Sequence, residues 1–259
     1  MKSTVVPPGP NAEDFVVVMT ATITPAPGVH VLRCDPEVRK RDYLEALQFW
    51  LDLADPRLQK IVFLENSGAP LDGFAALAAR SAKAVELIAV PPSPVPANFH
   101  YGYGEMKAIE YGLGHSHLLK EAKLIIKATG RLKFPGLVEL LDRLPGGLEI
   151  AVDCRNRGRM FGSKRGFAPT QLFIVAKGFY LDEFATAYDR MHEGYFMEQL
   201  IYDRLLGMPR SPRRVLRWPV SVEPVGFAAH GSKRYDSPAR VLVTGLRTAL
   251  RVIAPSYWF

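Results

Sequence analysis

The chain alternates short apolar runs, rich in β-branched residues, with longer segments whose apolar positions recur at helical spacing. The apolar runs predict strands at residues 15–23, 60–64, 85–90, 123–128, 149–154 and 170–176. Helical spacing predicts helices at 39–53, 71–82, 105–119, 134–144, 181–192 and 195–206. Strands that alternate with helices are joined by parallel crossovers. We therefore expect an α/β fold: a mostly parallel, twisted, Rossmann-like sheet with helices on both faces.

The pattern divides the chain into three parts. Residues 1–14 are a proline-rich arm without helical or strand periodicity, and residues 15–207 form the α/β domain. Residues 208–259 are a C-terminal extension with strand-like pieces at 215–222 and an amphipathic helix at 240–253. The chain ends in Tyr257, Trp258 and Phe259. Aromatic residues beside arginines suit a membrane interface; the alternative is a helix that packs back on the domain.

Composition narrows the class of protein. The formal net charge of +7 favours an anionic partner, and basic residues gather at 155–165 and 204–217. Such runs are either solvated loops or sites for phosphate or lipid headgroups. Cys34 and Cys154 form neither a metal-ligand pair nor a disulfide scaffold, which fits a reducing compartment. Without a signal-peptide pattern or a long apolar run, we expect a cytoplasmic protein, with peripheral inner-membrane contact as an option.

In a doubly wound sheet the ligand lies beyond the carboxyl ends of the strands. The residues directly after the predicted strands are therefore the first candidates for a binding site. They are Thr22 and Thr24; Glu65, Asn66 and Ser67; Thr129, Gly130 and Arg131; and Asp153 and Arg155.

Two of the loops carry a specific chemistry. Residues 102–107 (Gly-Tyr-Gly-Glu-Met-Lys) place glycines where a helix begins, so the backbone and the free N–H groups can approach an anion. This segment supplies Tyr103, Gly104, Glu105 and Lys107; the alternative is a tight turn. After the fourth strand, Arg131 can bind two phosphate oxygens at once, unless it is a surface residue on a structural turn.

The order of three segments resembles bacterial surface-polysaccharide glycosyltransferases of the GT-A type. The segments are residues 63–67 (Phe-Leu-Glu-Asn-Ser), 101–105 (Tyr-Gly-Tyr-Gly-Glu) and 127–131 (Lys-Ala-Thr-Gly-Arg). The resemblance spans residues 15–206. It implies a nucleotide-sugar donor and a saccharide or lipid-linked acceptor. In that family the strand after the glycine-containing helix usually ends in Asp-x-Asp, which holds a divalent cation; here Thr129-Gly130-Arg131 stands instead.

That departure implies a transferase without a bound metal or other cofactor. Arg131 then neutralises the leaving phosphate in place of the cation, with Arg155, Lys164 and Arg165 as weaker candidates. The family places a catalytic base near the start of a late helix, which selects Glu198, with Glu193 in reserve. For each glutamate the alternative is a helix N-terminal acid favoured by the helix dipole.

Two other function classes compete with this interpretation. One is a non-catalytic protein that binds RNA or an anionic surface through the basic runs, although these runs lack interleaved aromatic residues. The other is a different nucleotide-using enzyme, such as a nucleotidyltransferase, which needs acidic metal ligands after a strand; Asp153 alone is well placed for that. The six histidines form no ligand pair, and there is no nucleophile elbow of a hydrolase.

Overall fold

The computed structural model describes residues 15–26, 32–96, 99, 102–156, 166–228 and 234–254. The predicted N-terminal arm, the candidate cations Lys164 and Arg165, and the terminal aromatic residues 257–259 lie outside the described residues. In the described part, no helix has both the length and the hydropathy that a membrane span requires.

Seven strands of the described chain form one sheet in the order β3-β2-β1-β4-β6-β5-β7. The strands are β1 (Phe15–Ala21), β2 (Lys60–Glu65), β3 (Ala84–Ala89), β4 (Leu124–Thr129), β5 (Ile150–Ala151), β6 (Leu172–Ala176) and β7 (Arg214–Val215). β1 to β4 are parallel, β6 runs antiparallel to both β4 and β5, and β7 is parallel to β5. The expected mostly parallel sheet is confirmed, with β6 as the reversed strand.

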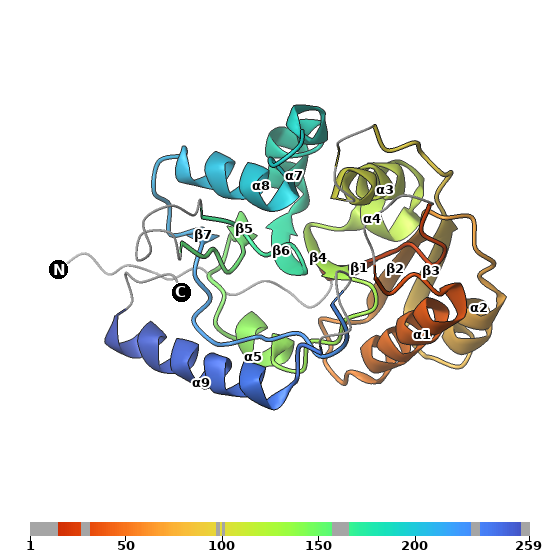
Figure 1. The fold of residues 1–259 in the computed structure, drawn as a ribbon, viewed down its shortest axis with the longest axis horizontal. Helices are drawn as coiled ribbons and strands as arrows, with labels where there is room; N and C mark the ends of the chain where they lie inside the picture. Colours follow the sequence, from red (N-terminus) through yellow and green to blue (C-terminus); the bar gives the residue numbers. More distant parts are fainter. Residues whose placement is uncertain are drawn as a thin grey trace.

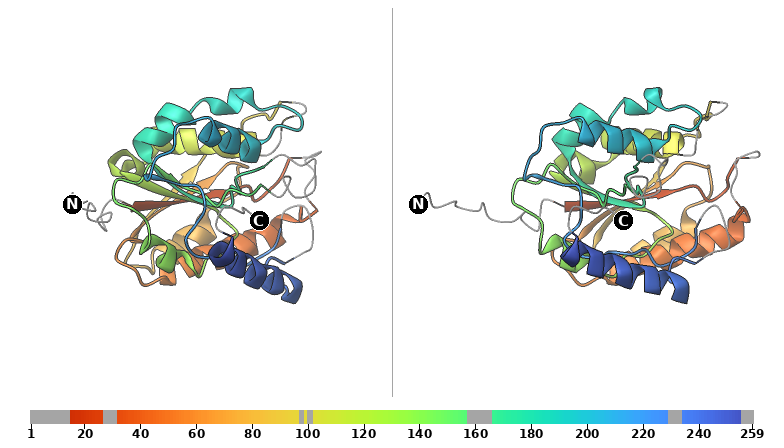
Figure 2. Two further views of the ribbon diagram at one scale, coloured as in Figure 1. Left: turned by 90° about the vertical axis from the view of Figure 1, so that its left-hand side faces the viewer. Right: turned by 60° about the vertical axis from the view of Figure 1, so that its left-hand side comes forward.

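β1 lies in the interior of this sheet, next to the central strand β4, and its sequence, FVVVMTA, is apolar on both faces. All seven of its residues are buried. Successive side chains of a strand point to opposite faces, so Val17 and Met19 enter one core and Val16 and Val18 enter the other. Figure 2 shows the resulting three layers, with the sheet between two layers of helices.

The helices divide between the two faces. They are α1 (Pro36–Asp52), α2 (Asp72–Ala78), α3 (Gly102–His115), α4 (His117–Glu121), α5 (Leu137–Leu141), α7 (Lys177–Glu183), the 3₁₀ helix η2 (Ala187–Arg190), α8 (Met197–Leu206) and α9 (Pro238–Ile253). α1, α2, α5 and α9 lie on one face of the sheet, and α3, α4, α7 and α8 lie on the other (Figure 1). The predicted helices on both faces are therefore confirmed.

Three predicted elements differ locally from those in the structure. The helix expected at 105–119 is two helices, because the buried Ser116 caps α4 at Leu119 N (3.0 Å) and donates to Glu86 of β3. The helix expected at 181–192 divides into α7 and η2. The strand expected at 149–154 shortens to the two residues of β5.

The end of β4 lies very close to β1 at Gly130. The Gly130 N–H donates to the Thr20 carbonyl oxygen at 2.9 Å. A Cβ at Gly130 would lie 2.7 Å from that oxygen and 3.3 Å from the Tyr43 ring. Both neighbours belong to the rigid core, so glycine is required here by packing within the protein.

We predict that Gly130→Ala lowers the free energy of unfolding by about 1–3 kcal/mol, because the added methyl group overpacks β1. Gly114→Ala, on the exposed side of α3 with open space around it, is the matched control. It should be neutral or gain up to about 1 kcal/mol from helix propensity. Urea denaturation measures both; equal stability of the two variants would contradict the close approach.

Candidate functional site

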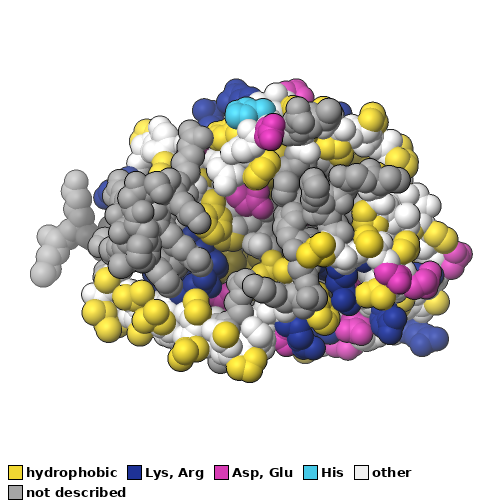
Figure 3. All heavy atoms as spheres, in the orientation of Figure 1, with side chains coloured by type: hydrophobic (Ala, Val, Ile, Leu, Met, Phe, Trp, Pro, Cys, Tyr) yellow, Lys and Arg dark blue, Asp and Glu magenta, His cyan; other side chains and the backbone are white. Residues whose placement is uncertain are grey.

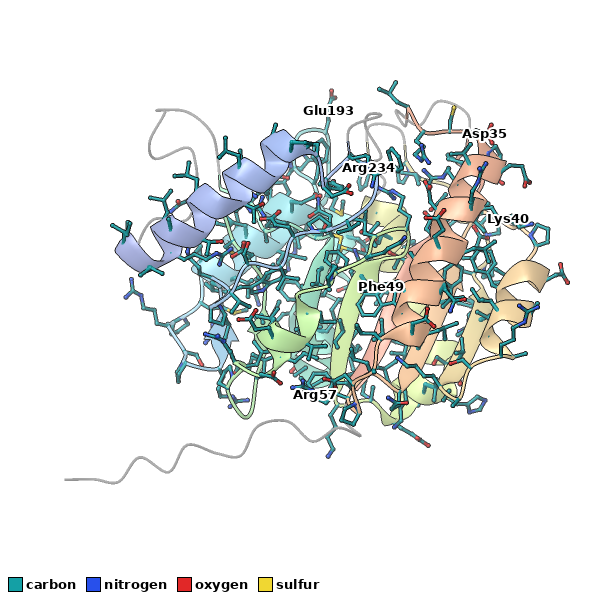
Figure 4. The ribbon with its side chains drawn as sticks, turned by 90° about the horizontal axis from the view of Figure 1, so that it is seen from below. Asp35, Lys40, Phe49, Arg57, Glu193 and Arg234 are labelled. Atoms are coloured by element: carbon teal, nitrogen blue, oxygen red, sulfur yellow. The ribbon has the colours of Figure 1, made fainter. Side chains whose placement is uncertain are left out.

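The carboxyl ends of six parallel strands and the start of β6 lie at one edge of the sheet. β5 is antiparallel to β6, which is antiparallel to β4, so the carboxyl ends of β5 and β7 lie on the same side as those of β1, β2, β3 and β4. We call this side the carboxyl edge. Figure 4 shows Asp35, at the start of α1, and Glu193 at this edge, with Arg57 at the opposite one.

A buried ion pair lies at the centre of the carboxyl edge. The Lys127 side chain, on β4, is fully buried, and its Nζ lies 2.7 Å from Oε1 of Glu105 in the first turn of α3. The same carboxylate oxygen accepts from Thr20 Oγ1 at 2.5 Å. Lys127 Nζ also donates to the Thr170 carbonyl oxygen at 2.5 Å. A buried charge has to be paired, and here three elements of the fold supply the partners.

Glu198 extends these contacts into a network. It lies in the first turn of α8, where Thr170 Oγ1 donates to its Oε1 at 3.2 Å and its carbonyl accepts from Ala168 N at 3.0 Å. We call Thr20, Glu105, Lys127, Thr170 and Glu198 the carboxyl-edge network. It joins β1, α3, β4 and α8, together with the segment that enters β6.

Burial raises the pKa of Glu198, and the Glu105 carboxylate raises it further. Its own backbone N–H, the Thr170 hydroxyl and Lys127 act in the opposite direction. A carboxyl group with a raised pKa, half-buried at the strand ends, has the properties of a general acid or base. The other predicted base, Glu193, is exposed on the turn between His192 and Tyr195 and points outward at the same edge (Figure 4).

Close packing of two helix starts brings Glu105 and Glu198 together. α3 begins at Gly102, three residues before the predicted start. A Cβ at Gly102 would lie 2.9 Å from Cβ of Met197, the first residue of α8. Gly102 therefore brings the first turn of α3 against the first turn of α8. The glycines of this loop were predicted to admit a ligand; Gly102 admits α8 instead.

The loop after β2 is built around the Glu65 carboxylate. This fully buried side chain accepts hydrogen bonds from the N–H groups of Ile23, Ser67 and Ala69 at 3.0–3.1 Å and from the Ser67 hydroxyl. Ser67 Oγ in turn accepts from Thr24 N at 2.9 Å. Glu65 and Ser67 thus hold the loops after β1 and β2 in one conformation.

Asn66 joins these loops to α3. Its Oδ1 accepts from Thr22 Oγ1 at 2.7 Å, and its Nδ2 donates to the Gly104 carbonyl at 3.4 Å. A Cβ at Gly104 would make ordinary contacts, so packing within the protein does not require glycine there. The predicted residues Thr22, Asn66 and Gly104 therefore lie side by side at the carboxyl edge.

Tyr103 and Lys107 face a neighbouring aromatic group. The Lys107 ammonium lies 5.5 Å from the ring centre of Tyr103 and 5.2 Å from that of Tyr188, and the two rings meet edge to face at 5.3 Å. These contacts direct Lys107 toward η2, although Tyr103 adjoins Gly104 on the same first turn of α3.

Arg131 lies at the junction with the C-terminal extension. Its Nε donates to the Phe227 carbonyl at 3.2 Å, and the Lys133–Val225 bridge fixes the same junction. Thr129 lies one step closer to the network, since its Oγ1 accepts from Lys127 Nζ at 3.4 Å. Of the predicted group, Thr129 and Gly130 adjoin the network directly, whereas the Arg131 side chain reaches toward residue 227.

Asp153 and Arg155 lie after β5 among the arginines of the extension. Asp153 is buried, accepts from Trp218 N at 3.2 Å and pairs with Arg251 at 2.6 Å. Arg155 Nη2 lies 3.8 Å from Asp153. These two predicted residues thus form a second cluster at the carboxyl edge, on the β5–β7 side.

Sequence reasoning did not select Lys127, Thr170 or Arg39 as site residues. Arg39, on α1, is buried and donates to the Thr22 carbonyl at 2.5 and 2.8 Å. The signal for Lys127 was present, because it is a lysine inside an apolar strand and such a residue has to find a partner. Arg39 precedes an apolar helix face and carries no comparable signal.

The donor atoms of the carboxyl-edge network do not fit a divalent cation. The Lys127 ammonium pairs with the Glu105 carboxylate and donates to the carbonyl oxygen of Thr170. The hydroxyl of the same Thr170 donates to Glu198. Within the ranges that the structure describes, no group of three or more His, Cys, Asp and Glu side chains is arranged to hold a metal ion. A hollow of about 530 Å³ lined by Glu149, Asp203 and Arg214 includes no network residue.

Comparisons with known proteins give a fold but no family. No protein-family model matches the chain, and no curated protein matches it in sequence. Among solved structures, the inositol-1-phosphate CTP transferase from T. maritima matches with a TM-score of 0.51 at 12% identity, over 93% of this chain and 97% of that one. Core-mannan synthase A from Aspergillus fumigatus, in an Mn/GDP form, matches with a TM-score of 0.48 at 8% identity, over 82% and 74%. The chain has a GT-A-like α/β fold, as the sequence predicted.

We predict that Glu198→Gln makes the protein more stable at neutral pH. A carboxyl whose pKa is higher in the folded state binds its proton more tightly there, so Glu198 favours folding at low pH. That contribution is lost as the pH rises from the unfolded pKa, about 4.3 for glutamate, through the folded one. The variant should therefore exceed the wild type at pH 7 and approach it below pH 4. Denaturant titrations at both pH values measure this, and a variant that is less stable at pH 7 would contradict it.

Proposed function

We propose that the protein is a glycosyltransferase. In this proposal it moves a sugar from a nucleotide-sugar donor to a saccharide or lipid-linked acceptor, in bacterial surface-polysaccharide synthesis and without a bound metal. The observation that carries the proposal is the carboxyl-edge network. It combines a buried cation and a carboxyl group of raised pKa at the edge where α/β sheets bind ligands.

The donor nucleotide fits the side of the edge formed by β1 and β2. Thr22 and Asn66 offer hydroxyl and amide groups for the base or ribose, and Gly104 makes only ordinary contacts beside them. Glu65 and Arg39 act as positioning residues, because their polar groups hold the loop backbone. The first turn of α3, with its partial positive charge, lies next to this group.

Transfer of the sugar places negative charge on the leaving nucleoside phosphate. Preorganised cations that meet this charge stabilise the transition state, by on the order of 3 kcal/mol for one such donor. Arg131, after β4, is the proposed cation, and it follows by four positions the buried Lys127, whose charge is already paired with Glu105. Glu198 is the proposed base for the acceptor hydroxyl. A carboxylate with a raised pKa is a stronger base, which favours transfer of the hydroxyl proton to it.

Metal independence is supported by the position of Lys127. A divalent cation at the end of β4 would have to displace an ammonium that is fully buried and bonded to Glu105 and Thr170. Repulsion between the two cations in a low-dielectric site would oppose binding.

The alternative is a nucleotidyltransferase, whose fold one solved match shares along nearly its whole length. Against it, Asp153 is the acid that was best placed to hold a metal. Its carboxylate already pairs with Arg251 and accepts from the Trp218 N–H. The other alternative, a non-catalytic anion- or RNA-binding protein, gives no role to a carboxyl group of raised pKa.

A panel of UDP-, GDP-, CMP- and TDP-sugars, with and without manganese, tests the proposal. We expect one donor class to raise the melting temperature without metal and to be cleaved slowly to free nucleotide. Glu198→Gln should keep the thermal shift and lose cleavage by roughly 10²- to 10⁴-fold, the usual contribution of a general base. Glu193→Gln, an exposed glutamate on the neighbouring turn, is the matched control and should retain activity.

Arg131→Ala separates the two parts of this proposal. If Arg131 meets the donor phosphates, the variant loses most of the thermal shift. A shift that is unchanged in Arg131→Ala would place the phosphates elsewhere, and a shift that EDTA abolishes would rule out metal independence. Loss of activity in Glu193→Gln but not in Glu198→Gln would exchange the roles of the two glutamates.

We further propose that α9 lies on an anionic membrane surface. Its arginines Arg247 and Arg251 turn inward, whereas Leu242, Leu246 and Val252 are 52–81% exposed. Figure 3 shows hydrophobic side chains along the outer surface of α9. The helix carries no acidic residue. It therefore has no negative charge to be repelled by anionic lipid, and its exposed apolar side chains can contact the acyl chains.

Vesicle sedimentation tests this contact. We expect the protein to bind vesicles of phosphatidylcholine and phosphatidylglycerol, and the double variant Leu242→Glu/Leu246→Glu to bind at least tenfold more weakly, because each glutamate adds charge to the apolar face. Leu181→Glu/Leu206→Glu, at exposed leucines of α7 and α8, is the control and should bind as the wild type does. Concentration-dependent dimerisation that the α9 variant abolishes, without vesicle binding, would identify a second copy as the occupant.

A further inference from the structure

Four arginines from three segments surround two carboxylates on the β5–β7 side of the carboxyl edge. Arg155 follows β5, Arg217 follows β7, and Arg247 and Arg251 lie on α9. Arg251 pairs with Asp153 at 2.6 Å, and Arg247 pairs with Glu223 at 2.9 Å. Arg155 lies 3.8 and 4.0 Å from the same two acids. The described cluster therefore holds two more positive charges than negative ones.

Arg217 is the arginine of this cluster that forms no ion pair with the described residues. Its three nitrogen atoms, Nε, Nη1 and Nη2, are all buried, and none has a hydrogen-bond partner among the residues that the structure describes. Burial lowers the pKa of its guanidinium, and Arg251 and Arg247 lower it further, while Asp153 partly compensates. A buried cation without a partner is strongly unfavourable, so the arrangement calls for an anion.

The neighbouring guanidinium groups leave further donors for that anion. Nε of Arg247 and Nε of Arg251 are also buried and have no hydrogen-bond partner within the described part of the chain. Trp218 is next to Arg217 in the chain. Its backbone N–H donates to Asp153, and its carbonyl oxygen accepts from Arg251 Nη1 at 2.5 Å. Arg217 is thus held against the ion pairs of α9, and its donors add to theirs. Several guanidinium donors around a surplus of two positive charges match a phosphate group, which offers more acceptor oxygens than a carboxylate.

This cluster lies apart from the proposed nucleotide side but next to the proposed base. In the strand order, β7 is four positions from β1, and strands are about 4.8 Å apart, so the two strand ends are separated by about 19 Å. The Arg155 backbone pairs with Phe167 at 2.8 and 2.9 Å, and the next residue, Ala168, donates to the Glu198 carbonyl. In Figure 3 basic side chains lie in the hollow of this face on the side of β5 and β7.

We propose that Arg217, Arg247 and Arg251 bind a phosphate group of the acceptor. The inference rests on the proposed function and deepens it, because it makes the acceptor a phosphorylated molecule with its anion across Glu198 from the donor. The phosphate belongs either to a soluble phosphate ester or to the headgroup of a lipid. A lipid source is the one that the apolar outer face of α9 would bring to these arginines.

Titration with inorganic phosphate and pyrophosphate at constant ionic strength, followed by melting temperature, tests the site. The wild type should be stabilised. Arg217→Met should bind the same probe roughly 10- to 100-fold more weakly, because it loses a hydrogen bond to a charged group. Arg210→Met, at an exposed arginine of the same basic run, should bind as the wild type does. Equal affinity in both variants would reduce the effect to general ion binding and overturn the proposal.

The stability of the ligand-free variants separates a binding role from a structural one. Removal of an unpartnered buried cation should leave Arg217→Met at least as stable as the wild type. A large loss of stability would show that the guanidinium has a partner within the fold, and would overturn the proposal. The more conservative Arg217→Lys keeps the charge and should recover part of the affinity, which a purely structural effect of shape would not predict.

Two further measurements complete the test. The first identifies the source of the phosphate, and the second distinguishes failure of this proposal from failure of the proposed function. Arg217-dependent binding to phosphatidylcholine vesicles that contain a polyprenyl phosphate, but not to methyl phosphate, supports a lipid acceptor; binding to both supports phosphate esters generally. Nucleotide-induced stabilisation should be unchanged in Arg217→Met. Its loss would assign the cluster to the donor and overturn the acceptor proposal, whereas its absence in the wild type would refute the proposed function alone.

Discussion

The buried ion pair between Lys127 and Glu105 is the constraint on which the arrangement of the carboxyl edge depends. Lys127 is placed on β4, in the most buried part of the sheet, where an unpaired ammonium could not remain charged. Its partners come from the first turn of α3 and the segment before β6. Because removal of one partner from a buried pair is far more costly than loss of a surface pair, these elements have to meet at this point.

The same pair links packing to chemistry. The Glu105 carboxylate pairs with Lys127 and also raises the pKa of Glu198, which is partly buried at the start of α8. Two carboxyl groups therefore share one edge but differ in environment. Glu105 is paired with a cation, whereas Glu198 is desolvated and accepts from the Thr170 hydroxyl. In the proposed transferase, this difference would let two acids of the same kind take different roles. The glycines of the edge serve it indirectly, since Gly102 and Gly130 allow α8 and β1 to approach.

Much of the fold followed from the apolar pattern, and less of the site did. The strand runs at 15–23 and 60–64 were predictable because β-branched residues buried on both faces leave a clear signal. The rule that ligands meet the strand ends brought Thr22, Asn66 and Gly104 into one group, which the structure places together. It could not distinguish residues that face a ligand from those that hold a loop, as Glu65 does, because that depends on side-chain direction.

The residues that escaped prediction are those whose partners are distant in the chain. Lys127 and Glu105, Arg251 and Asp153, and Glu198 and Thr170 are each separated by 22 or more positions, and no local pattern encodes such a pairing. α9 illustrates the point most clearly. Its periodicity indicates an amphipathic helix but not which side faces the protein. The structure turns Arg247 and Arg251 inward and Leu242 and Leu246 outward. That orientation is explained if the inward arginines have an anion to bind at the carboxyl edge and the outward leucines have an apolar phase to contact. A phosphate carried by a membrane lipid would satisfy both sides of the helix at once.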